Sequence, residues 1–142
     1  MGNKGGPVPL LQFRGLTAML REAHAHFGAS APDVPTTDVD PDCEAKRGEW
    51  LRQEVTELEE AIDAGDLRQI GKEGADVMYV AAGTLMTFGI DPDRAMAAVH
   101  ASNMTKEAAG NAKAVKGPGY QPADMDSALW PDGGPAADLE AT

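Results

Sequence analysis

Two pairs of acidic residues with the same spacing are the side chains of this sequence best arranged for chemistry. Glu54 and Glu57 form one pair, and Glu73 and Asp76 form the other. On a helix, residues three apart lie on one face with Cβ atoms ~5–6 Å apart, close enough for two carboxylates to share a cation. A hard, all-oxygen ligand set favours Mg²⁺ or Mn²⁺ over zinc or copper. The four acids therefore predict a metal site, provided that two helices bring the pairs together.

The residues around these pairs predict the helices that such a site requires. An apolar stripe predicts one helix from about Glu44 to Ala64, and Gly65 supplies its stop. Asp66 is placed to cap a second helix, from Leu67 to about Phe88. Because the connecting turn is short, we expect the two helices to be antiparallel neighbours.

Acid pairs on helices are most often solvated surface, so the metal site has an ordinary alternative. Asp76 argues against that alternative, because it is followed at once by the apolar run VMYVAAGTLMTF. The sequence offers this acid no obvious basic partner, and a carboxylate that enters a core without one requires a cation. The position of Asp76 therefore favours the metal site.

The rest of the chain predicts an all-α fold. Few aromatic residues and an apolar supply of Ala, Leu, Val and Met favour helices over strands. Two further helices are expected from about Leu10 to Phe27 and from Pro92, after the capping Asp91, to about Ala108. The expected architecture is a four-to-five-helix bundle followed by an irregular Gly/Pro-rich C-terminal arm.

The expected organisation has three parts. Residues 1–9 form a flexible lead, residues 10–109 the helical domain, and residues 110–142 the arm. Glycine and proline recur too often after Gly110 for regular structure, and the last residues are expected to be disordered.

Charge and hydropathy narrow the possible partners. A net charge of −11 disfavours duplex nucleic acid and anionic membranes as partners. The chain has neither a run of ~20 apolar residues nor a signal-peptide core, so we expect a cytoplasmic protein. Thin apolar stripes on a chain of 142 residues predict that helices complete their burial in an oligomer.

Four ordered blocks of the sequence resemble one enzyme family. The blocks are EVTELEEAI, EGADVMYVAAGTLMTFGID, VHASNMTK and VKGPGYQPADM. They resemble the MazG-like all-α nucleoside triphosphate pyrophosphohydrolases, near the dimeric dUTPase-like members and phosphoribosyl-ATP pyrophosphohydrolase. The resemblance spans roughly residues 16–125. The family signature E-x-x-E followed by E-x-x-D corresponds here to Glu54, Glu57, Glu73 and Asp76.

The resemblance implies a Mg²⁺-dependent hydrolase that acts in a homodimer or homotetramer. Its substrate would be a nucleoside triphosphate, cleaved between the α- and β-phosphates to a monophosphate and pyrophosphate in housecleaning of nucleotide pools. Such chemistry depends on positioning and charge neutralisation, both of which metal ions supply. Either Glu54 or Glu57 would accept a proton from the attacking water, and the sequence does not choose between them.

Four residues outside the acid pairs are expected to bind the phosphates. Asn103 and Lys106 stand three apart near the end of the last predicted helix, where they are expected to share one face. Lys116 and Tyr120 frame the turn KGPGY. Glycines in such a turn let the backbone approach an anion. The ordinary alternatives are an exposed lysine near a helix C-terminus and a plain loop.

Two positions depart from the family pattern. Gln53 stands where many members have a further glutamate, and the stretch AGNAKAVKGPG lacks the usual Asp-Gly-Lys, which leaves Lys113 without support as a phosphate contact.

Several large side chains have two interpretations, as contacts of the nucleotide base or as core. His24 and Phe27 can be a core-edge histidine and a packed phenylalanine, and we expect Trp50 and Tyr79 to be core.

Two other functions remain open. One keeps the metal site but takes phosphoribosyl-ATP as substrate, and the other is a non-catalytic acidic helical module that binds a partner protein.

Overall fold

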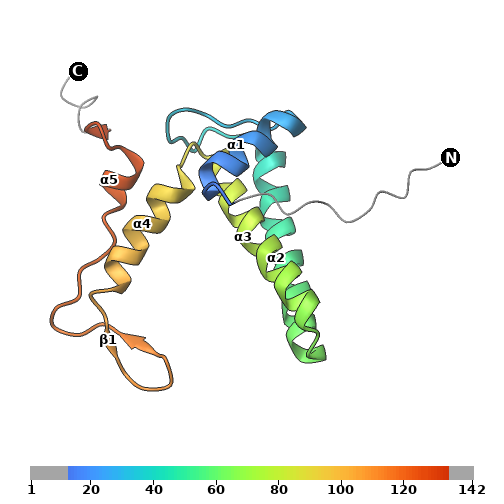
Figure 1. Ribbon diagram of the computed structural model, residues 1–142. Helices are drawn as coiled ribbons and strands as arrows, with labels where there is room; N and C mark the ends of the chain where they lie inside the picture. Colours follow the sequence, from blue (N-terminus) through green and yellow to red (C-terminus); the bar gives the residue numbers. More distant parts are fainter. Residues whose placement is uncertain (1–12, 135–142) are drawn as a thin grey trace.

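The computed structural model describes residues 13–134 and contains five helices and one small hairpin of strands (Figure 1). The all-α prediction is confirmed. The predicted lead, residues 1–9, and the last residues, 139–142, which are predicted to be disordered, lie outside the described residues. The elements are α1 (Leu16–Phe27), α2 (Pro41–Ala64), α3 (Leu67–Thr87), α4 (Pro92–Asn103), β1 (Glu107–Ala108), β2 (Ala114–Val115) and α5 (Met125–Leu129).

The two longest helices, α2 and α3, form an antiparallel hairpin, as the sequence predicts (Figure 1). Gly65 ends α2 with a φ of 65°, in the left-handed region that favours glycine. The carboxylate of Asp66 then accepts hydrogen bonds from the backbone N–H groups of Arg68 and Gln69 at the start of α3. This turn sets the two helices side by side.

The Asp66 cap leads to a stability prediction. Asp66→Ala removes the acceptor for two backbone N–H groups, so the free energy of unfolding should fall by about 1 kcal/mol. Urea denaturation followed by circular dichroism measures the change. Asp63→Ala, at an exposed position before the turn, is the matched control. Equal stability of the Asp66 variant and wild type would contradict the prediction.

The small core lies at the end of the hairpin remote from the Gly65 turn. There α1 packs on α3, and Leu20, Ala82 and Met86 are 2–4% exposed. The first helix begins at Leu16 rather than Leu10, since residues 13–15 are not helical and Gly15 has a φ of 95°. Residues 10–12 lie outside the described residues.

Contacts with α1 hold the start of α4. The Thr17 hydroxyl donates to the carboxylate of Asp91 at 2.6 Å, and the backbone N–H of Leu16 donates to Asp93 at 3.0 Å. From this junction α4, the strands and α5 form a second limb that diverges from the α2–α3 hairpin (Figure 1). The fold is therefore an open arrangement of two limbs joined at α1.

The prediction that the fourth helix runs to Ala108 is wrong, because α4 ends at Asn103. The segment around Gln121 hydrogen-bonds to residues at and just after the end of α4. The backbone N–H of Gln121 donates to the Thr105 hydroxyl at 2.8 Å, and the Ser102 hydroxyl donates to the Gln121 carbonyl at 2.7 Å. These bonds turn the chain into β1 instead of a further helical turn.

The prediction that no regular structure follows Gly110 is also wrong. Strand β2 pairs antiparallel with β1, and α5 is capped by Asp124, which accepts from the backbone and hydroxyl of Ser127. Helix α2 starts three residues before the predicted Glu44, with Asp40 as cap and Pro41 at its first position. Among residues 13–134, no helix is long and apolar enough to cross a membrane.

Candidate active site

Three of the four predicted acids meet across the seam between α2 and α3. Glu54, Glu57 and Glu73 each offer a carboxylate oxygen, and these oxygens lie within 4.8 Å of one another. Opposite ligands of a Mg²⁺ ion at its usual bond length are ~4 Å apart, so small side-chain rotations would close this set around one ion. The spacing of the acids and the hairpin turn together produce this cluster.

The burial of these carboxylates fits a cation. Glu73 is 7% exposed, and one oxygen of Glu73 and one of Glu54 are buried without a hydrogen-bond partner among the described residues. Burial raises the pKa of Glu54, and the charges of Glu57, Asp76 and Glu73 raise it further. Unpartnered buried oxygens are costly, and a divalent cation supplies the missing partner.

Asp76 has a basic partner that the sequence analysis missed. The Nζ of Lys72 lies 2.9 Å from Asp76 and 3.2 Å from Glu73, and these hydrogen bonds raise the pKa of Lys72. The expectation that Asp76 lacks such a partner is therefore wrong. The i, i+4 spacing of Lys72 and Asp76 on one helix is the sequence feature that could have predicted this ion pair.

The position of Lys72 leads to a second prediction. Lys72→Met removes a positive charge beside two acids, so Mg²⁺ alone should bind about three- to tenfold more tightly, since exposed pairs contribute modestly. Isothermal titration calorimetry measures the affinity. Arg68→Met, an exposed position one turn earlier on α3, should leave it unchanged. Weaker Mg²⁺ binding by the Lys72 variant would contradict the prediction.

Gln53, at a position where the resemblance predicts a glutamate, has a supporting contact. Its side-chain amide donates to a carboxylate oxygen of Glu57 at 3.2 Å. An amide at this position orients Glu57 and adds no charge to the cluster.

The comparison with known families agrees with this arrangement of acids. The family model for phosphoribosyl-ATP pyrophosphohydrolase matches residues 20–103. The chain belongs to this family. No curated protein compared with the chain matches it. The matched segment contains all of α2 and α3, with the four acids and Lys72, and ends with α4 at Asn103.

Family membership makes the protein a nucleotide pyrophosphohydrolase, a hydrolase of phosphoanhydride bonds. The family is typically dependent on a divalent metal, and the acidic cluster of this pyrophosphohydrolase has the composition for one. An interpretation as a non-catalytic module does not agree with membership in an enzyme family.

The predicted phosphate-binding residues lie on the other limb of the pyrophosphohydrolase. Asn103 ends α4, whereas Lys106 follows the helix in a bend, so the expectation that both share a helix face is wrong. The Nζ of Lys116 lies 4.9 Å from the centre of the Tyr120 ring, next to the strands. Since α4 packs on α1, α3 and α5, and the limbs diverge (Figure 1), one chain does not bring these residues to the acids.

The aromatic side chains are more exposed than the core interpretation predicts. Trp50 is 44% exposed and Tyr79 43%, so their assignment to the core is wrong. Phe27 is 77% exposed and its ring contacts the neighbouring His26 ring edge to face, so it lies outside the core, whereas His24 is 4% exposed, as a core-edge histidine would be.

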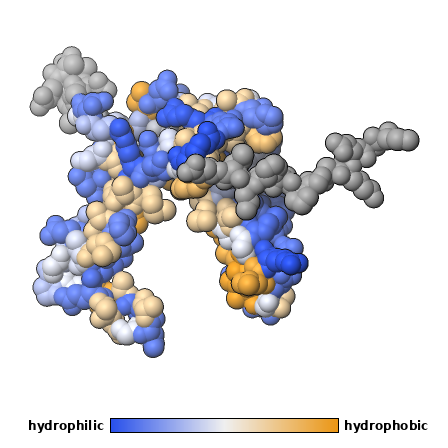
Figure 2. Space-filling view, viewed as in Figure 1, coloured by the Kyte–Doolittle hydropathy of each residue, from blue (hydrophilic) through white to orange (hydrophobic). Residues whose placement is uncertain are grey.

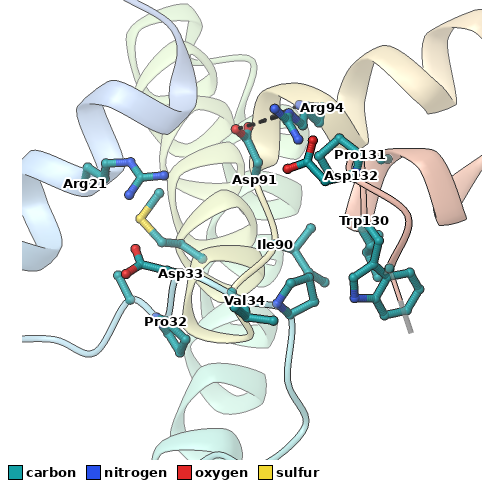
Figure 3. A pocket seen from close by; sticks show the side chains of 17 residues that line it. Arg21, Pro32, Asp33, Val34, Ile90, Asp91, Arg94, Trp130, Pro131 and Asp132 are labelled. Carbon is teal, nitrogen blue, oxygen red and sulfur yellow. Dashed lines mark hydrogen bonds and ion pairs between the residues drawn. The ribbon is translucent and has the colours of Figure 1, made fainter. Parts of the chain in front are cut away.

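A cavity of about 420 Å³, shown in Figure 3, has none of the four acids in its wall. Its wall combines residues from the loop after α1, the end of α3, the start of α4 and the segment around Trp130. Arginine and aspartate alternate around it, and Arg94 lies 4.0 Å from Asp91. Because no predicted site residue lines this cavity, it does not contribute to the site proposed from the acids.

Proposed function

We propose that this protein is a Mg²⁺-dependent pyrophosphohydrolase that cleaves (d)NTP to (d)NMP and pyrophosphate, in housecleaning of the cytoplasmic nucleotide pool. The observation that carries the proposal is the cluster of Glu54, Glu57 and Glu73, with two buried carboxylate oxygens that have no partner among residues 13–134. Such a cluster in a member of a pyrophosphohydrolase family is best explained as a metal site.

In this proposal Glu54, Glu57, Glu73 and Asp76 hold Mg²⁺, for which Mn²⁺ can substitute. The metal supplies charge neutralisation for the phosphates and a more acidic water. Either Glu54 or Glu57 takes the proton of the attacking water. The ammonium group of Lys72, beside Glu73 and Asp76, stays close enough to attract the triphosphate.

Asn103, Lys106, Lys116 and Tyr120 bind the triphosphate in the proposal, and they reach the acids from a second copy of the chain. The divergence of the two limbs supports this arrangement, since a site within one chain would hold acids without phosphate-binding groups. The hairpin also offers surface for a partner. Ile62 and Leu67, next to the turn, are 55% and 82% exposed, and Figure 2 shows hydrophobic side chains gathered at that end.

A site that combines residues of two chains requires an oligomer, which we propose to be a homodimer or homotetramer. Exposed apolar side chains on the hairpin are the surface that such an assembly would cover.

Phosphoribosyl-ATP is the second candidate substrate, and the family match favours it as directly as it favours a pyrophosphohydrolase activity. Both substrates place a triphosphate on the same acids. The two substrates differ at the end remote from the triphosphate, where phosphoribosyl-ATP carries its phosphoribosyl group.

The experiment measures pyrophosphate release from NTPs, dNTPs and phosphoribosyl-ATP, with Mg²⁺ or with a chelator. The enzymes are wild type, Glu57→Ala and Asp76→Ala, with circular dichroism to verify folding. Cleavage of a (d)NTP only with Mg²⁺, and its loss in both folded variants, would support the proposal. Cleavage of phosphoribosyl-ATP alone would replace the substrate, and no cleavage of any of them would refute the proposal.

A further inference from the structure

Arg47 lies on the same seam as the acidic cluster. It precedes Glu54 by seven residues on α2, which corresponds to ~10.5 Å along the axis and to nearly the same direction around it. On α3, Gly83 follows Asp76 by seven residues. A Cβ atom at Gly83 would lie 2.9 Å from Nη1 of Arg47, so the guanidinium sits against this glycine, two turns beyond the acids.

Arg47 has hydrogen-bonding capacity that the described chain does not use. Its Nε is buried without a partner, and it forms no ion pair with a carboxylate in the part of the chain that the structure describes. The chain has 23 acidic residues against 12 basic ones, so an arginine without an acidic neighbour is not explained by a shortage of acids. A buried donor without an acceptor is costly, and this one lies on the α2–α3 seam that also holds the acids.

His24 adds a second polar atom without a partner at the same place. It is 4% exposed, and its Nδ1 donates to the carbonyl oxygen of Ser30 at 3.1 Å. Its Nε2 is buried without a partner and would lie 3.5 Å from the same Cβ position at Gly83 that Arg47 approaches. The guanidinium of Arg47 also lies 5.3 Å from the centre of the Trp50 ring. Histidine and tryptophan thus limit the directions in which the guanidinium can point.

The glycine at position 83 also indicates that the space beside α3 accommodates the guanidinium of Arg47. Glycine inside a helix is less stable than alanine, and Gly83 is a buried residue in the C-terminal part of α3, four residues before its end. Its missing side chain leaves the space in which Nη1 of Arg47 lies. Glycine at position 83 therefore lowers the stability of α3 but leaves room for the guanidinium of Arg47.

We propose that Arg47 binds the end of the substrate remote from the cleaved phosphoanhydride, donating hydrogen bonds from its guanidinium to an acceptor atom there. His24 and Gly83 are positioning residues that hold the guanidinium in place. The inference rests on the proposed function, because its distance from the acids matters only if they bind the triphosphate. Two groups could supply this hydrogen-bond acceptor. One is a carbonyl oxygen or ring nitrogen of the base of a (d)NTP, and the other is the phosphate of the phosphoribosyl group in phosphoribosyl-ATP.

The test compares Arg47→Met and Arg47→Lys with wild type on every substrate that wild type cleaves. Losing a charged hydrogen bond should raise KM 10- to 100-fold and leave kcat within about threefold. Lysine should restore little, because it lacks the planar fork and the stacking on Trp50. Arg52→Met is the matched control, since Arg52 is an exposed arginine on another face of α2, and its KM should equal that of wild type.

The source of the acceptor follows from which substrate is affected. If the base supplies it, KM for the (d)NTP rises, and the affinity for the corresponding monophosphate, measured by calorimetry, falls by a similar factor. If the phosphoribosyl phosphate supplies it, KM for phosphoribosyl-ATP rises and KM for any (d)NTP is unchanged.

Gly83→Ala separates positioning from damage to the fold. The added methyl group displaces the guanidinium, so KM should rise, while the better helix former should raise the midpoint of thermal unfolding by a few degrees. An unchanged KM in Arg47→Met for every cleaved substrate would overturn this inference alone. If that variant does not fold, an unchanged KM in both Arg47→Lys and Gly83→Ala has the same meaning. A wild type that neither cleaves nor binds any nucleotide would overturn the proposed function, and this inference with it.

Discussion

Glu73→Gln is expected to lose pyrophosphohydrolase activity by at least ~100-fold while its folded state becomes more stable in the absence of Mg²⁺. Loss of a group that only orients a metal ligand costs 10- to 100-fold, so loss of a proposed ligand should cost more. The free energy of unfolding should rise by about 1 kcal/mol. The three carboxylates have oxygens within 4.8 Å of one another and repel each other, and the substitution replaces one of them by a neutral amide.

Thermal unfolding with and without Mg²⁺ measures the second half of this prediction. For wild type, Mg²⁺ at ~100 times its Kd should add about 2.7 kcal/mol to the free energy of unfolding, and for Glu73→Gln the addition should be small. Glu60→Gln is the control, since Glu60 is an exposed acid on α2 outside the cluster. A Glu73 variant that keeps wild-type activity, or that still gains the full stability from Mg²⁺, would remove Glu73 from the metal site.

Mixing two inactive variants is expected to restore activity if each site combines residues from two chains. Glu57→Ala removes an acid from one limb, and Lys106→Ala removes a proposed phosphate contact from the other. In a homodimer formed from equal amounts of both, half of the dimers are mixed, and each mixed dimer has one intact site of two. Activity should therefore return to about one quarter of wild type, as two-fold symmetry requires.

A second mixture controls for this result. Glu57→Ala and Glu73→Ala alter the same limb, so their mixed dimers have no intact site and should remain inactive. Light scattering after gel filtration establishes the assembly in each sample. If the first mixture stays inactive although mixed dimers form, the phosphate-binding residues do not act across the interface.

The sequence by itself determined the features that depend on neighbours along the chain. The i, i+3 spacing of the acids, the stop at Gly65 and the cap at Asp66 are local signals, and they predicted the α2–α3 hairpin and its acidic seam correctly. The all-α class followed from composition for the same reason, since helix preference is largely a property of each residue.

Tertiary structure decided the features that depend on distant residues. Helix α4 ends at Asn103 because Gln121, far along the chain, bonds to Ser102 and Thr105. The exposure of Trp50 was also invisible in the sequence, because an apolar stripe does not reveal whether another element covers it. The separation of Lys106 from the acids also depends on contacts between residues that are distant in the sequence. The direction in which a second limb leaves a hairpin is set by contacts such as that of Thr17 with Asp91, which lie 74 residues apart and leave no periodic pattern in the sequence.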